Sequence, residues 1–146
     1  MPNLNNLNLK NAEDNFFIAN TPIFFMRKLL SDPVVEEVRK TLSPEEIIVK
    51  LNEISKTQVT SLREAVLPFV LLVALSFESN KKYLIMAANI NVDRNGWFKY
   101  ISQVLLEIHN PAEIFNFRVP NLLESPKISF NTQNSTQRIT FSEGHL

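Results

Sequence analysis

The stretch SLREAVLPFVLLVALSF, residues 61–77, decides how this chain folds. Placed on a helix at about 100° per residue, its apolar side chains cover nearly the whole circumference, which is typical of an element surrounded by others. The apolar run 65–75 is shorter than the roughly 18 to 20 residues of a membrane-spanning helix. The sequence therefore predicts a central core helix that begins at a capping box of Ser61 and Glu64 and is kinked or broken at Pro68.

Three helix-start signals precede this stretch at a regular interval. Thr21-Pro22, Asp32-Pro33 and Ser43-Pro44 each combine a capping side chain with a proline suited to the first helical position. The signals follow one another every eleven residues, which leaves room for short helices and sharp corners. We therefore expect helices over residues 22–30, 33–41 and 44–55.

The segments after the core helix first show helical spacing of apolar residues and then alternate with period two. Helical spacing of apolar residues predicts one helix over 80–89 and another from Trp97 to about Ile108, and Asn110-Pro111 opens a short one. Residues 127–142 instead alternate with period two, which predicts a β-hairpin with Ile128 opposite Phe141 and Phe130 opposite Ile139.

The resulting expectation is a mainly α protein. Residues 21–142 should form a single compact domain of six to seven helices that ends in the hairpin, arranged as an orthogonal bundle or as an armadillo-like stack. Seven asparagines among the first 20 residues predict a flexible amino-terminal arm over 1–20, because asparagine favours turns over helix. Residues 143–146 should be a short tail.

Composition argues against several classes of function. Two glycines, two histidines and no cysteine among 146 residues exclude the familiar phosphate-binding loops and thiolate chemistry. A formal net charge of zero, with charges of both signs scattered, argues against nucleic-acid and membrane partners. The first residues lack a secretory signal pattern, so we expect a cytoplasmic protein.

One short motif resembles a metal site. Asn91-x-Asp93-x-Asn95-Gly96 has the spacing of the first half of an EF-hand calcium loop. The closing glutamate position holds Ser102, so a calcium ion would face a single carboxylate. Turn chemistry before a helix explains the same residues, and we expect neither a metal nor a cofactor.

The strongest functional signal is a set of apolar residues on helix faces that should be polar. Phe24 projects between Arg27 and Lys28, Val49 lies between two glutamates, and Leu106 lies between Lys99 and Ser102. A large aromatic side chain flanked by cations resembles an interface anchor with a polar rim. We therefore predict a non-catalytic interaction or adaptor module whose interface residues are Phe24, Arg27, Lys28, Val49 and Leu106, and whose partner is another protein or a second copy.

Two alternatives remain open at this stage. The amino-terminal arm could fold back through Phe16 or Phe17 and cover Phe24. The protein could instead be a small-molecule-binding domain or an enzyme, with a pocket between helices near Trp97, Tyr100 and His109. His109 has no nucleophile or orienting group at a recognisable spacing, and a histidine at a helix end often caps that helix.

Overall fold

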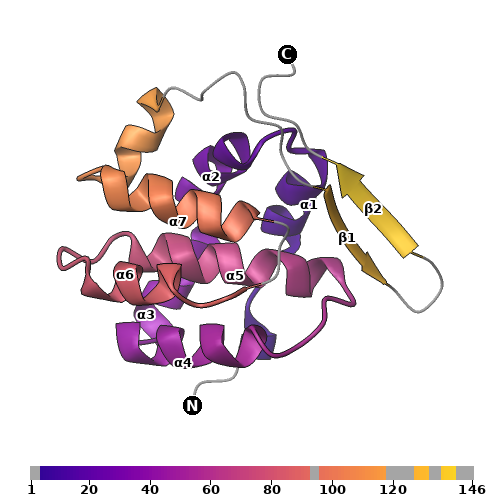
Figure 1. Cartoon of the computed structure of the whole chain (residues 1–146), viewed down its shortest axis with the longest axis horizontal. Helices are drawn as coiled ribbons and strands as arrows, with labels where there is room; N and C mark the ends of the chain where they lie inside the picture. The colour runs from indigo at the N-terminus through magenta and orange to yellow at the C-terminus, as the bar shows by residue number, and fades with distance from the viewer. Residues whose placement is uncertain (1–3, 93–95, 118–126, 132–135, 141–146) are drawn as a thin grey trace.

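The computed structural model describes residues 4–92, 96–117, 127–131 and 136–140. This part of the chain is compact and mainly helical (Figure 1). Its α-helices are α1 (Lys10–Ile18), α2 (Pro22–Leu30), α3 (Pro33–Thr41), α4 (Pro44–Ile54), α5 (Leu62–Leu75), α6 (Lys82–Ala88) and α7 (Trp97–Glu107). Two 3-10 helices, η1 (Leu4–Asn6) and η2 (Pro111–Asn116), complete the helical elements of the described residues.

The three proline-marked helices begin where the sequence predicts. The Thr21 side chain accepts a hydrogen bond from the Phe24 amide, Asp32 accepts one from the Val34 amide, and Ser43 forms a full capping box with Glu46. Each proline occupies the first helical position, where a missing N–H costs nothing. The corners between these helices are therefore encoded locally.

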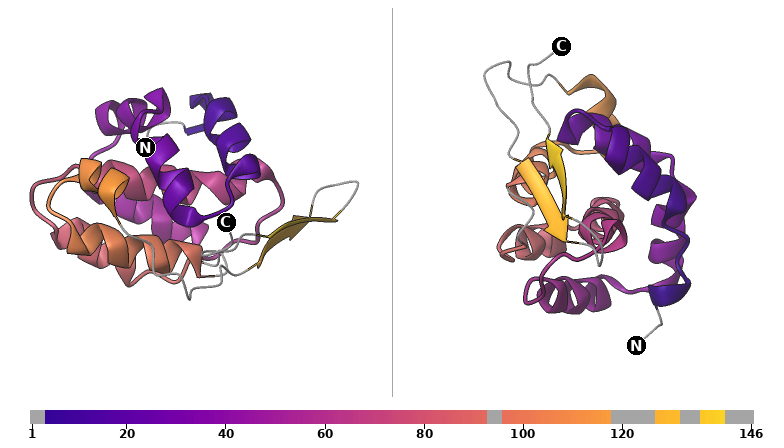
Figure 2. Two further views of the ribbon diagram at one scale, coloured as in Figure 1. Left: turned by 90° about the horizontal axis from the view of Figure 1, so that it is seen from above. Right: turned by 90° about the vertical axis from the view of Figure 1, so that its right-hand side faces the viewer.

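Helix α5 lies at the centre of the protein and packs against each of the other six α-helices described (Figures 1 and 2). All ten residues from Ala65 to Leu75 other than Leu67 are buried, which explains why its sequence is apolar all round. The helix is continuous through Pro68, so a break at that residue is wrong, while a kink there stays a prediction. Packing on all sides compensates for the backbone hydrogen bond that proline cannot donate.

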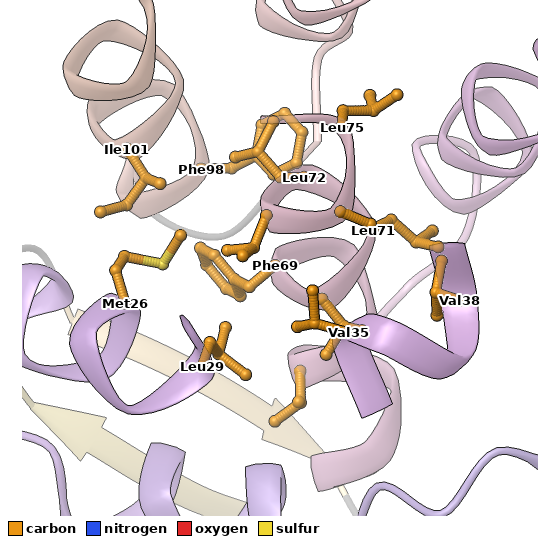
Figure 3. Packing of buried hydrophobic residues seen from close by; sticks show 14 of the residues in the cluster. Met26, Leu29, Val35, Val38, Phe69, Leu71, Leu72, Leu75, Phe98 and Ile101 are labelled. Carbon is orange, nitrogen blue, oxygen red and sulfur yellow. The ribbon is translucent and has the colours of Figure 1, made fainter. Parts of the chain in front are cut away.

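The core is organised around an aromatic cluster. Phe16 lies 5.0 Å from Phe25 and 5.8 Å from Trp97 between ring centroids, with edge-to-face geometry in both pairs. Phe69 of α5 makes edge-to-face contacts with Phe25 and Trp97 as well. Figure 3 shows how aliphatic side chains from α2, α3 and α7 converge on Phe69 and its neighbours. This cluster joins the first, second, fifth and seventh helices into one core.

The predicted amino-terminal arm is the main error of the sequence analysis. Residues 4–20 form η1 and α1, and Leu4, Leu7, Leu9 and Phe16 are all buried. The six of these asparagines that lie within the described residues occupy exposed or half-buried positions, while the leucines between them are buried. A segment rich in turn-forming residues can still be packed into the core. The free energy gained by burying its apolar side chains exceeds the free energy lost through the low helix propensity of asparagine.

Four basic side chains connect distant parts of the chain by donating to backbone carbonyls. Arg63 on α5 bonds the carbonyls of Leu4 and Leu7, at 2.7 and 3.0 Å. The other three pairings are Arg27 with Ile114 and Phe117, Lys81 with Leu106 and Ile108, and Lys99 with Ala88. These contacts satisfy carbonyls at the ends of short elements, which would otherwise lack partners.

The carboxy-terminal strands are β1 (Lys127–Asn131) and β2 (Thr136–Thr140), which pair antiparallel. Ile128 lies opposite Ile139 instead of Phe141, and the hairpin that the sequence predicted over residues 127–142 is not supported. The two registers differ by two residues, and a period-two pattern cannot distinguish them. Phe141 lies outside the described residues.

Candidate interaction surface

Phe24 is exposed in the first turn of α2, as its position between two cations predicted. Its side chain is 39% exposed, whereas the adjacent Phe25 is completely buried. The Thr21 cap sets the start of the helix, and the 100° step between neighbouring residues then turns one phenylalanine outward and the next inward. The Lys28 ammonium lies 5.2 Å from the centre of the Phe24 ring, a cation–π contact at the surface.

Three further large apolar residues are exposed on the elements that adjoin Phe24. Phe17 and Ile18 end α1 and are 57% and 62% exposed, and Phe115 of η2 is 53% exposed. Helix α2 packs against both α1 and η2. We refer to Phe17, Ile18, Phe24 and Phe115 together as the Phe24 surface.

The fold-back alternative is half right. The amino-terminal segment does pack into the core through Phe16, but it does so against Phe25, and both Phe17 and Phe24 stay exposed. The sequence contained a signal for this outcome. Phe16, Phe17 and Ile18 are consecutive on a helix, so they project about 100° apart and cannot all face one core.

The two cations beside Phe24 have different environments. Lys28 is exposed and lies against the ring. Arg27 is half-buried, and its Nε and Nη2 donate to the carbonyls of Ile114 and Phe117, each at 3.1 Å. Arg27 thus holds η2, and with it Phe115, against α2. The sequence suggested that both cations form a polar rim around Phe24, but the Arg27 guanidinium instead donates to two backbone carbonyls.

Val49 and Leu106, the remaining predicted interface residues, differ in their exposure to solvent. Val49 on α4 is 47% exposed, whereas Leu106 on α7 is half-buried and packs against the core. Of the two polar residues taken to mark a solvent face of α7, Ser102 is buried and its hydroxyl donates to the Phe98 carbonyl, whereas Lys99 is exposed and donates to the Ala88 carbonyl. Leu106 therefore lies nearer the core than its polar neighbours implied.

Helix α6, which packs against α4, carries two exposed apolar residues that the sequence analysis did not single out. Ile85 and Met86 are 51% and 46% exposed. Helix α4 packs against α6, and the Tyr83 hydroxyl of α6 donates a hydrogen bond to the Glu45 carboxylate of α4. We refer to Val49, Ile85 and Met86 as the α4–α6 ridge. The seven-residue α6 was too short for its faces to be assigned from spacing.

The Glu45–Tyr83 contact shifts the titration of both groups. The Tyr83 hydroxyl donor lowers the pKa of the Glu45 carboxyl, and the accepting carboxylate raises the pKa of Tyr83. A lowered carboxyl pKa stabilises the fold above the unfolded-state value, and that contribution disappears as the pH falls through the folded-state pKa. The raised tyrosine pKa stabilises the fold below its unfolded-state value and is lost as the pH rises through the folded-state pKa.

Tyr83→Phe should therefore raise the pKa of Glu45 toward that of an ordinary glutamate, because the hydroxyl that favours the carboxylate is gone. A carboxyl-detected NMR titration of wild type and variant would measure the change. Tyr100→Phe is the matched control and should leave the Glu45 midpoint in place. An unchanged midpoint in Tyr83→Phe would show that the two side chains do not interact in solution.

The alternative pocket is not assembled from its three predicted residues. Trp97 is completely buried within the aromatic cluster, Tyr100 is half-buried, and His109 is exposed beyond the end of α7. Lys81, and not His109, donates to the Leu106 and Ile108 carbonyls at that end. The longer, flexible lysine reaches these carbonyls from the position directly before α6, a contact that no local spacing reveals.

Two open hollows lie beside the amino-terminal segment instead. One, of about 280 Å³, is lined by Asn6, Asn8 and Asn11 together with Asp32, and the other, of about 430 Å³, includes Lys50 and Arg63. The buried Asp32 carboxylate caps α3 and accepts a hydrogen bond from Asn11 at 3.3 Å. Its oxygens hold α1 to α3, so this polar group has a structural role.

Among the described residues, no group of three or more histidine, cysteine, aspartate or glutamate side chains is placed to hold a metal ion. The calcium-like motif includes residues 93–95, which lie outside the described residues. Gly96 follows them with φ of 88°, a left-handed conformation at the start of α7 that glycine adopts without strain.

The exposed apolar surface is the main guide to the function of this protein. No helix in the described ranges has both the length and the apolar character needed to cross a bilayer. No protein-family model matches the chain, and no curated protein or solved structure matches it.

Proposed function

We propose that this protein is a non-catalytic interaction module that binds a protein partner through the Phe24 surface. The observation that carries the proposal is the exposure of four large apolar side chains, three of them phenylalanines, on contacting elements. Aromatic residues dominate the binding energy of protein interfaces, and clusters of exposed aromatics are uncommon on surfaces without a partner.

The surroundings of Phe24 indicate the chemistry of the partner. Lys28 is the cation at the rim, and its ammonium is already positioned over the ring. Arg27 holds η2 in place through two backbone carbonyls, so Phe115 needs little rearrangement before binding. A surface that presents apolar side chains beside a carboxylate would complement both features.

The test compares immobilised wild type with Phe24→Ser and Phe115→Ser as baits in a lysate of the native source. A partner of the Phe24 surface should be captured by wild type and lost from both variants. Once it is purified, Phe24→Ala should weaken its affinity by about tenfold or more, and Lys28→Glu should weaken it most at low salt.

Val49→Ser is the matched control, because Val49 is exposed to a similar extent on a different helix. It should retain whatever wild type captures. Capture that is equal for wild type, Phe24→Ser and Phe115→Ser would refute the assignment of this surface.

We further propose that the helices are arranged as an orthogonal bundle or an armadillo-like stack, that the protein is cytoplasmic, and that its partner is not a nucleic acid. The capture experiment also tests the adaptor role.

A further inference from the structure

The α4–α6 ridge is a second exposed apolar surface, separate from the residues that form the Phe24 surface. Val49, Ile85 and Met86 are each close to half exposed. The residues beneath them are buried, namely Ile47, Ile48 and Leu51 on α4 and Leu84 and Ala87 on α6. The ridge therefore stands on the core and is joined across its two helices by the Glu45–Tyr83 hydrogen bond.

The two helices of the ridge run in the same direction. Helix α5 runs opposite to both, and in Figure 1 α4 and α6 each begin at the left. Glu45 and Tyr83, which touch, both lie in the first turn of their helices. Val49 is four residues after Glu45 and Met86 is three residues after Tyr83, so the apolar residues follow at the same level.

The charges along the ridge differ between its two helices. Helix α4 exposes Glu45 before Val49 and carries the Lys50–Glu53 ion pair after it, at 3.5 Å, whereas α6 exposes Lys82 in its first turn. A two-fold axis parallel to the helices places α4 of one copy over α6 of the other. Glu45 then faces Lys82 of the second copy, and Val49 faces its Met86, so opposite charges and apolar groups match simultaneously.

The other two-fold arrangement is less favourable. An axis across the helices places α4 over its own copy in the opposite direction, which brings Glu45 against the Lys50–Glu53 ion pair of the second copy. Glu45 would then face a carboxylate and a cation that already has a partner, so charge complementarity selects the first arrangement. We propose that the α4–α6 ridge binds a second copy of this chain, across a two-fold axis parallel to α4 and α6.

The ridge is small, so association should be weak and dependent on concentration. Sedimentation velocity of the full chain over a concentration series should show a reversible dimer. Met86→Asp should raise the dimer dissociation constant by about tenfold or more, because it places a carboxylate in an apolar contact. Phe17→Asp, which adds the same charge on the Phe24 surface, should leave the dimer unchanged.

Cross-linking distinguishes the two axes directly, since the chain contains no cysteine. Val49→Cys and Met86→Cys proteins should form disulfide-linked heterodimers when mixed, faster than either forms homodimers alone. Faster Val49→Cys homodimers would overturn the parallel axis. Wild type that stays monomeric up to about 1 mM, or a dimer unaffected by Met86→Asp, would overturn the surface assignment.

The outcome is independent of the proposed function. If capture depends on Phe24 but the protein is monomeric in solution, only the self-association proposal is refuted. If the protein forms the dimer but no partner binds the Phe24 surface, only the proposed function is refuted.

Discussion

Phe25→Ala should lower the free energy of unfolding by about 3 to 5 kcal/mol, the usual range for truncating a core phenylalanine. Phe25 is completely buried, and its ring contacts Phe16 and Phe69 at centroid distances of 5.0 and 5.7 Å. The substitution would leave a cavity between α1, α2 and α5, where close packing limits relaxation. Urea unfolding followed by circular dichroism would measure the change.

Phe24→Ala is the matched control for this prediction, because it removes the same side chain one residue earlier. Its ring is 39% exposed, so the loss should be less than about 1.5 kcal/mol. If Phe24→Ala is the more damaging of the two, then the orientation of α2 in solution differs from that described here, and the Phe24 surface loses its basis.

Leu9→Ala should lower the free energy of unfolding by about 2 to 5 kcal/mol, the range found for buried leucines. Leu9 is 1% exposed and directly precedes α1. A flexible arm would predict a change of only a few tenths of a kcal/mol for the same substitution. Thermal and urea unfolding of Leu9→Ala therefore distinguish a packed amino-terminal segment from a flexible one.

Two further variants support this test. Arg63→Met keeps the apolar stem but removes the donors to Leu4 and Leu7, and should cost about 1.5 to 3 kcal/mol. Asn6→Ala changes an exposed residue of the same segment and should stay within about 0.5 kcal/mol of wild type. A Leu9→Ala protein as stable as Asn6→Ala would show that residues 4–9 do not pack as described.

Part of the candidate site could be predicted from the sequence. The exposure of Phe24 and of Val49 followed from helix starts that local capping determines, and the structure agrees with both. Phe115, Ile85 and Met86 could not be assigned, because η2 and α6 are too short to show periodicity. The hydrogen bonds of Arg27 could not be predicted either, because the carbonyls of Ile114 and Phe117 that accept them lie 87 and 90 residues away in the chain.

The sequence by itself determined where most helices begin, that the protein is mainly helical, and that residues 62–75 form its centre. These properties depend on groups within a few residues of one another, namely caps, prolines and apolar periodicity. Only the tertiary structure decided that residues 4–20 belong to the core and which cations face inward. Burial of Leu4 and the targets of Arg63 depend on segments that meet only after folding, so no local pattern encodes them.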